Sequence, residues 1–127
     1  MRTAILAIED NSDNMELFAW ILEDEGFAFE GVGSAEEGLA SLERGSFDLV
    51  LMDIALPGID GKEATRRIRA VPRFVRLPVI AVTAHASKSE TKEILAAGVT
   101  CVITKPVERA RLIQAIKSGL LEGPSHD

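Results

Sequence analysis

Three acidic side chains stand where two apolar runs, each typical of a buried strand, come to an end. Glu9 and Asp10 follow the run over residues 3–8, and Asp53 follows the run over residues 47–52. Because the carboxyl ends of neighbouring parallel strands meet at one edge of a sheet, we expect these carboxylates to lie close together. Two such charges about 4 Å apart repel by roughly 4 kcal/mol at an effective dielectric constant of 20. A divalent cation removes this repulsion, and oxygen ligands without His or Cys favour Mg²⁺.

A simpler explanation exists for the first two acids. Glu9 and Asp10 also precede a stretch with helical periodicity, so they could act as helix caps and as partners of the helix dipole. That alternative does not account for Asp53, whose position at the end of a second strand favours a shared site.

Two further polar residues end apolar runs. Thr83 follows residues 79–82, and Lys105 follows residues 101–103 and precedes Pro106. A lysine ammonium is a flexible point charge suited to phosphate, and a threonine hydroxyl could donate to a phosphoryl oxygen. The alternatives are an ordinary β-branched strand residue and a solvated residue at a strand exit. A cis Lys105-Pro106 bond, which a proline at this position makes accessible, would direct the lysine back across the strand ends.

Together these side chains could carry out phosphoryl transfer. A carboxylate such as Asp53 can act as a nucleophile and form an aspartyl phosphate. Mg²⁺ would then neutralise charge on the transferring group, while Lys105 and Thr83 would hold the remaining oxygens.

Short apolar runs alternate with amphipathic stretches along the chain, which predicts five strand–helix repeats. The expected strands cover residues 3–8, 27–32, 47–52, 79–82 and 101–103; the expected helices cover residues 12–25, 34–44, 61–70, 87–97 and a last stretch that includes Leu112, Ile116 and Leu120. This order predicts an α/β fold with one doubly wound parallel sheet and helices on both faces. The run over 47–52 does not alternate, as expected for a strand covered on both faces, whereas 27–32 suits a position near an edge.

The composition indicates one domain that folds without disulfide bonds or a structural metal ion. The chain has 127 residues, 46% of them apolar, a net charge of −6 and a single cysteine, Cys101. This charge disfavours a nucleic-acid surface, and one cysteine fits a reducing compartment. No stretch approaches the roughly 20 apolar residues of a membrane span, and Glu9 interrupts the first run too early for a signal peptide. We expect a cytoplasmic domain over residues 1–122, with 123–127 as a short disordered tail.

Four blocks of sequence, in order and at matching spacing, resemble the response-regulator receiver domain of two-component signalling, of the single-domain, chemotaxis-regulator type. The resemblance runs from about Thr3 to Leu121 and implies a flavodoxin-like sheet of strand order 2-1-3-4-5. The blocks are Ile8-Glu9-Asp10-Asn11, Leu51-Met52-Asp53-Ile54 with Leu56-Pro57-Gly58-Ile59-Asp60-Gly61, Ala81-Val82-Thr83-Ala84 and Thr104-Lys105-Pro106.

The resemblance implies a role for each acidic residue of the site. Asp53 would be the phosphoacceptor and would receive phosphate from a sensor histidine kinase or a phosphotransfer protein. Asp10 and Asp53 would bind Mg²⁺ directly, together with the backbone carbonyl of Ala55, and Glu9 would act largely through water.

The resemblance also makes Thr83 the switch hydroxyl and Lys105 the phosphate-binding lysine. One position departs from the family pattern, because Val102 stands where many receivers carry Tyr or Phe. We therefore expect the signal to travel through the loop after Thr83 and the following helix. His85 could orient a water for hydrolysis of the phosphoaspartate or be a solvated loop residue, whereas Ala55 has no side chain for that role.

We expect a phosphorylation switch that is not an enzyme in the usual sense. Because no output domain follows the last helix, the signal should reach a downstream target protein through the face formed by the fourth helix, fifth strand and fifth helix.

The alternative is a degenerate receiver that serves as a protein docking module. An aspartyl phosphatase would need an acid where Ala55 stands. This sequence also lacks the glycine-rich loop that a nucleotide- or flavin-binding protein would carry. The sequence leaves open whether the chain was excised from a hybrid kinase. Arg66, Arg67 and Arg69 have the pattern of a solvated helix face.

Overall fold

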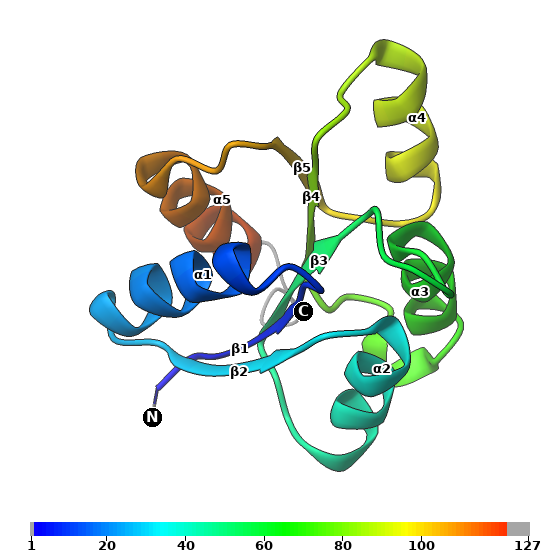
Figure 1. The fold of residues 1–127 in the computed structure, drawn as a ribbon. Coiled ribbons are helices and arrows are strands. Elements are labelled where there is room, and N and C mark those ends of the chain that lie inside the picture. The colour runs from blue at the N-terminus through cyan, green and yellow to red at the C-terminus, as the bar shows by residue number, and fades with distance from the viewer. Residues whose placement is uncertain (1, 122–127) are drawn as a thin grey trace.

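The computed structural model describes residues 2–121, which form a five-stranded parallel sheet flanked by helices (Figure 1). The strand order is β2-β1-β3-β4-β5, so the predicted topology is confirmed. The tail predicted over residues 123–127 lies outside the described residues. The strands are β1 (Ala4–Ile8), β2 (Ala28–Val32), β3 (Leu49–Asp53), β4 (Val79–Thr83) and β5 (Cys101–Thr104).

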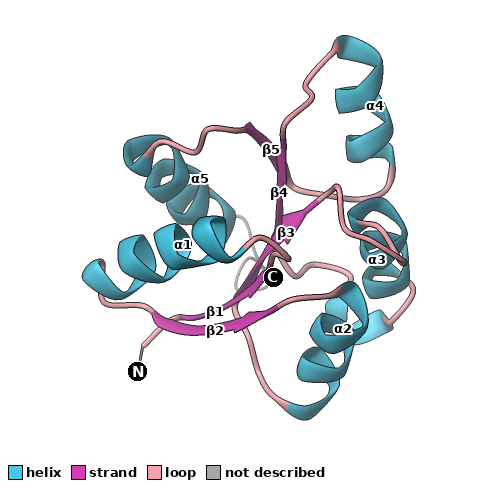
Figure 2. Ribbon diagram, in the orientation of Figure 1, coloured by secondary structure: helices cyan, strands magenta, loops and turns pink. Residues whose placement is uncertain are grey.

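The helices lie on both faces of the sheet, as predicted, with α1 and α5 on one face and α2, α3 and α4 on the other (Figure 2). The ends of the first four helices differ from the predicted ones by at most one residue, and a short 3₁₀ turn, η1, forms in the loop before β4. The bounds are α1 (Ser12–Asp24), α2 (Ala35–Arg44), α3 (Gly61–Arg69), η1 (Pro72–Phe74), α4 (Lys88–Ala96) and α5 (Arg109–Leu121).

Strand β3 is the centre of the core. All five of its residues are buried, and successive side chains point to opposite faces, so Val50 and Met52 pack with α2, α3 and α4 while Leu49 and Leu51 pack with α1 and α5. This double coverage explains the lack of alternation in the sequence. Strand β2 is an edge strand, as expected.

Capping residues start the helices close to the strand ends. The side chains of Asn11, Ser34, Asp60 and Ser87 each accept the backbone N–H three residues further on. Each cap satisfies a donor that the first helical turn leaves open. Because these helices follow strands in the chain, their capped ends lie at the carboxyl edge of the sheet, where the candidate site also lies.

Arg69 corrects one prediction, because it does not lie on the solvated face of α3. Its Nε donates to the Gly98 carbonyl at 2.9 Å, and its Nη1 donates to the carbonyls of Phe74 and Leu77 at 2.8 and 2.6 Å. Burial lowers the pKa of this guanidinium. Gly98 has a φ of +113°, and a Cβ there would lie 2.8 Å from Arg69 Cγ, so glycine suits this contact on two counts. The periodicity missed this arginine, which flanks the buried stripe of α3.

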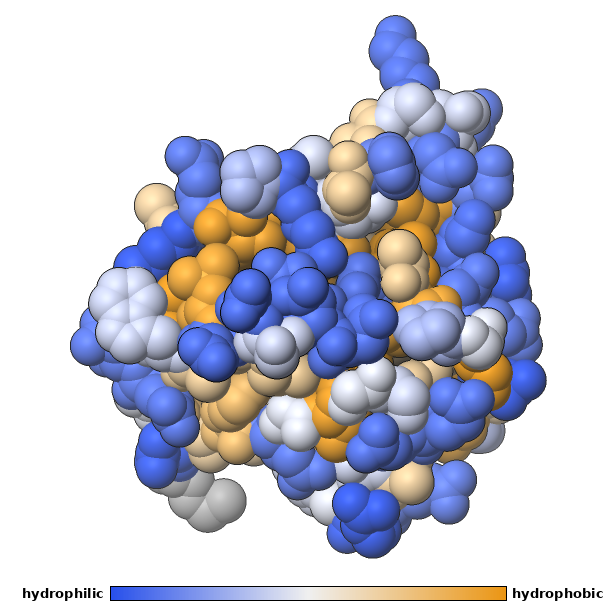
Figure 3. Space-filling view, in the orientation of Figure 1, coloured by the Kyte–Doolittle hydropathy of each residue, from blue (hydrophilic) through white to orange (hydrophobic). Residues whose placement is uncertain are grey.

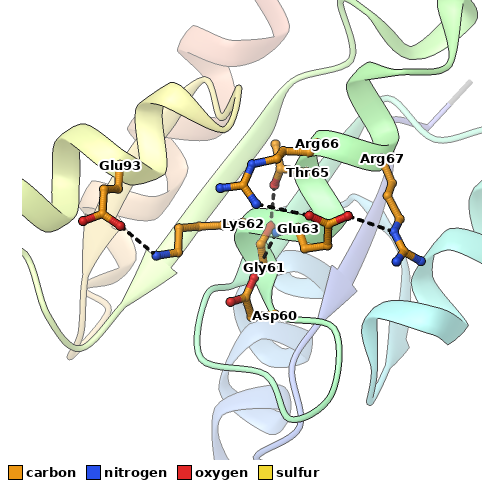
Figure 4. A network of polar contacts seen from close by, with 8 residues as sticks. All are labelled: Asp60, Gly61, Lys62, Glu63, Thr65, Arg66, Arg67 and Glu93. Carbon is orange, nitrogen blue, oxygen red and sulfur yellow. Dashed lines mark hydrogen bonds and ion pairs between the residues drawn. The ribbon is translucent and has the colours of Figure 1, made fainter.

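Arg66 and Arg67, by contrast, lie on the surface as predicted, and both pair with Glu63 at 3.2 Å (Figure 4). On the face drawn in Figure 3, hydrophobic residues show as separate patches among hydrophilic ones. No helix within residues 2–121 has the length and apolar content that crossing a membrane requires.

Candidate functional site

The acidic residues predicted to share a site do come together. One carboxylate oxygen from each of Glu9, Asp10 and Asp53 lies within 4.8 Å of the others. The sheet brings them there because β1 and β3 are neighbours and Ile8 pairs with Met52, so Glu9, just after β1, lies level with Asp53, the last residue of β3. Glu9 and Asp53 are buried, at 2% and 3% exposure, whereas Asp10 is exposed.

Lys105 is the cation of this site. Its Nζ lies 3.5 Å from Asp53 Oδ1 and 3.6 Å from Glu9 Oε1. The Lys105-Pro106 bond is cis, as expected, and the Lys105 N–H donates to the Thr83 carbonyl at 2.8 Å. One ammonium therefore faces several carboxylates, and this part of the site carries an excess of acidic groups.

Glu9 is a buried side chain whose hydrogen-bonding capacity is only partly used. Its Oε2 accepts the Asn11 N–H at 3.2 Å, but its Oε1 is buried and has no hydrogen-bond partner among the described residues. Desolvation by burial, together with the hydrogen bond and negative charge of Asp53, raises the pKa of Glu9 to about 7. A buried carboxylate with an open oxygen, beside two further carboxylates, is a donor set that fits a hard divalent cation.

The capping alternative for the first two acids does not hold in its simple form. Asn11 is the N-cap of α1, because its Oδ1 accepts the Asn14 N–H at 2.9 Å. Glu9 binds one backbone N–H at the same helix end, but through one oxygen only. The cap therefore leaves Asp10 and the second oxygen of Glu9 facing the shared site.

Thr83 ends β4 and is buried, at 4% exposure. Its hydroxyl donates to the His85 carbonyl at 3.0 Å and accepts the His85 N–H at 3.1 Å. The hydroxyl predicted to bind a phosphoryl oxygen is thus engaged by the loop that leads to α4. The His85 side chain is exposed, and Val102 is half-buried against the core beneath α4.

The loop after β3 is held by backbone contacts that the sequence did not reveal. The Ala55 N–H donates to Asp53 Oδ1 at 3.2 Å, and the Gly61 N–H donates to the Ile54 carbonyl at 3.0 Å. A Cβ on Gly61 would lie 2.5 Å from the backbone oxygen of Asp53, so only glycine lets α3 begin this close to β3. Metal binding by the Ala55 carbonyl stays a prediction.

Comparison with known families decides what this strand-end site belongs to. The sequence model of the response regulator receiver domain matches residues 5–117. The chain is a response regulator receiver domain. Its topology and the order of its motifs agree with that assignment.

Relatives of this receiver occur both as small proteins and within large ones. The polar-differentiation response regulator DivK of Brucella ovis is 37% identical over 120 residues, which cover 94% of this chain and 98% of DivK. The sensor protein GacS of Pseudomonas syringae is 36% identical over 115 residues, which cover 88% of this chain but only 13% of GacS. The chain thus spans a small part of the length of the sensor kinases it matches.

A solved structure provides the comparison for the acidic site. The receiver domain of the sensor histidine kinase PA1611 from Pseudomonas aeruginosa is 34% identical, with a TM-score of 0.88 over 94% of this chain and 98% of that chain. That receiver has a magnesium ion coordinated in its active-site cleft. The chemotaxis protein CheY4 of Vibrio cholerae, at 23% identity and a TM-score of 0.90, supports the shared fold.

Proposed function

We propose that this receiver domain is a phosphorylation switch in which Asp53 accepts a phosphoryl group from a histidine kinase or a phosphotransfer protein. The observation that carries the proposal is the strand-end cluster, where Lys105 and the open oxygen of buried Glu9 face Asp53. Such a cluster is unfavourable by itself and becomes favourable with a cation and a phosphoryl group in place.

Asp10 and Asp53 would hold Mg²⁺ directly, with the Ala55 carbonyl completing the protein ligands, and Glu9 would hold it largely through water. Bound there, the ion would neutralise charge on the transferring phosphoryl oxygens. An oxygen of Asp53 attacks phosphorus, the P–N bond of the donor phosphohistidine breaks, and its electron pair returns to the imidazole nitrogen. Lys105, within 3.5 Å of Asp53 Oδ1, binds an oxygen of the transferred group.

Thr83 would couple phosphorylation to the surface. To donate to a phosphoryl oxygen, its hydroxyl has to give up its bond to the His85 carbonyl. The loop before α4 then loses one anchor, which changes the preferred position of that loop and of α4. Val102 has no ring to turn inward, so the loop and α4 carry the change to the α4-β5-α5 face and a downstream target protein. The chain works in the cytoplasm, without membrane insertion and without direct contact to nucleic acid.

The test uses a small-molecule phosphodonor. With acetyl phosphate and Mg²⁺, intact-mass measurement should show one added phosphoryl group on the wild-type protein and none on Asp53→Asn. Asp13→Asn, an exposed acid in the first turn of α1, is the matched control and should label normally. Labelling that survives Asp53→Asn would show that the site assignment is wrong.

A second measurement separates the switch from a docking module. Beryllofluoride with Mg²⁺ should move the amide signals of residues 83–97 in NMR spectra. If these signals stay in place while those of the metal site respond, the protein binds the ion without switching, and the degenerate-receiver alternative is favoured.

A further inference from the structure

A second surface feature lies between α2 and α3. Apolar side chains that include Leu39, Ile68, Val71 and Phe74 line a pocket of about 270 Å³, and the charged Glu43 and Arg67 also belong to the lining. We call this the α2–α3 pocket. Its volume is below the range of about 300–1,000 Å³ typical of small-molecule sites, so it suits a few apolar side chains of another protein.

Exposed apolar residues extend this surface beyond the pocket. Val71 is 37% exposed and Val75, one turn beyond it, is 57% exposed. Large hydrophobic side chains in contact with water next to an apolar pocket are a feature of interaction surfaces. The surface belongs to the face of the sheet covered by α2, α3 and α4, on the side where α2 and α3 run next to each other (Figure 1).

The segment that forms the α3 side of this surface carries a charge opposite to that of the whole protein. Residues 61–75 contain five of the 14 basic residues of the chain but only one of its 20 acidic residues, although the net charge of the chain is −6. The basic residues are Lys62, Arg66, Arg67, Arg69 and Arg73, and the acid is Glu63. Such a local reversal of charge favours an acidic partner.

Two of these arginines are held at the pocket. Arg67 pairs with Glu63 at 3.2 Å, but Glu63 serves Arg66 as well, so one carboxylate faces two guanidinium groups (Figure 4). Arg73 lies 4.4 Å above the Phe74 ring and donates to the Leu42 carbonyl at 3.4 Å. Both of these Arg73 partners are neutral. Around the pocket the cations Arg66, Arg67 and Arg73 outnumber the acids Glu43 and Glu63, and the arginines are placed before a partner arrives, which lowers the entropy cost of binding.

We propose that the α2–α3 pocket docks an acidic amphipathic helix of a partner protein. Apolar side chains at i, i+3 and i+4 of that helix would enter the pocket, and carboxylates beside them would pair with Arg67 and Arg73. A nucleic acid fits less well, because the pocket is apolar and the chain as a whole would repel a polyanion.

Docking there is independent of phosphorylation. The pocket is formed by the second halves of α2 and α3, and both helices run back from the carboxyl edge of the sheet, where Asp53 lies. The pocket therefore lies toward the opposite edge, away from the acidic cluster. A partner bound there would keep the receiver in place whether or not Asp53 carries a phosphoryl group, which is a tethering role separate from the switch.

The experiment compares two synthetic helical peptides on the whole chain. One carries leucines along one stripe with glutamates beside them, and its twin carries lysines in place of the glutamates. We expect the glutamate peptide to bind about tenfold more tightly in calorimetry, with NMR shifts at Leu39, Val71 and Phe74. Arg67→Glu and Arg73→Glu should remove this preference, whereas Lys117→Glu, a charge reversal at an exposed residue of α5, should leave it.

Several outcomes would overturn the proposal. Equal affinity for the two peptides, or shifts that map elsewhere, would show that the pocket does not select acidic helices. Concentration-dependent self-association that Arg67→Glu abolishes would assign the pocket to a second copy of the chain.

Two further variants serve as controls. Val71→Ser should weaken binding of the glutamate peptide without altering charge, and it checks the apolar contribution if an arginine variant folds poorly. Asp53→Asn should bind the peptide as wild type does, so failure of the proposed switch and failure of this docking site are distinguishable.

Discussion

Arg69 and Lys105 are both partly buried cations, yet their surroundings differ in kind. Arg69 donates to three neutral carbonyls at 2.6–2.9 Å, so its hydrogen-bonding groups are well used. Lys105 lies 3.5 and 3.6 Å from two carboxylates, close enough for attraction but longer than a hydrogen bond. The first arrangement is complete without a ligand. The second leaves negative charge uncompensated and room for a ligand between the groups. This is the difference between a structural clamp and a candidate site.

The largest expected effect comes from breaking the clamp. Arg69→Met removes the guanidinium donors of three carbonyls before β4 and β5, of which, among the described residues, only that of Phe74 keeps another donor, the Leu77 N–H, and we expect it to lower the free energy of unfolding by about 4 kcal/mol. Urea denaturation measures this change. Arg66→Met, on the solvated side of the same helix, should cost no more than about 0.5 kcal/mol. Equal effects of the two substitutions would contradict the assignment of Arg69 as a clamp.

The acidic cluster should respond to pH in the opposite sense from most carboxylates. Because the folded protein raises the pKa of Glu9 from 4.5 to about 7, the folded state binds more protons than the unfolded state between these values. In EDTA, the free energy of unfolding should therefore fall as pH rises from about 4.5 to about 7, by at most about 3 kcal/mol, and then level off. Glu9→Gln, which cannot ionise, should flatten this part of the profile; an unchanged slope would place its origin elsewhere.

Mg²⁺ should offset that loss at neutral pH. An ion that binds the folded state alone, at a hundred times its dissociation constant, adds about 2.7 kcal/mol to the free energy of unfolding. Thermal or urea denaturation with and without MgCl₂ measures this gain. Asp10→Asn should reduce the gain and Asp13→Asn should not, whereas a gain that survives in Asp10→Asn would remove Asp10 from the metal site.

The smallest effect is expected at the surface. Lys62 and Glu93 join α3 to α4 at 3.2 Å, but the Glu93 side chain is 60% exposed (Figure 4). Glu93→Gln should change the free energy of unfolding by less than about 0.5 kcal/mol, because water screens such a pair. A loss comparable with that of Arg69→Met would show that surface ion pairs contribute as much to stability as the buried Arg69 contacts. The contrast drawn between Arg69 and Lys105 would then not hold.

The sequence alone was sufficient for the order of the elements and for the place of the acidic cluster. Apolar runs, helical periodicity and capping residues are properties of neighbouring residues, so they predicted the strands, the helices and the acids at the strand ends. The doubly covered β3 and the edge strand β2 followed from the same patterns. Local preference is sufficient here because each element buries one face or both according to its own pattern.

The environments of single side chains, in contrast, depend on contacts between elements that are distant in the sequence. Arg69 meets Gly98 across 29 residues of sequence, Gly61 makes room for the end of β3, and Thr83 is already engaged by the next loop. The raised pKa of Glu9 likewise depends on burial and on Asp53, 44 positions away. Such properties arise from distance and desolvation between elements, and those quantities do not exist until the sheet and its helices have packed.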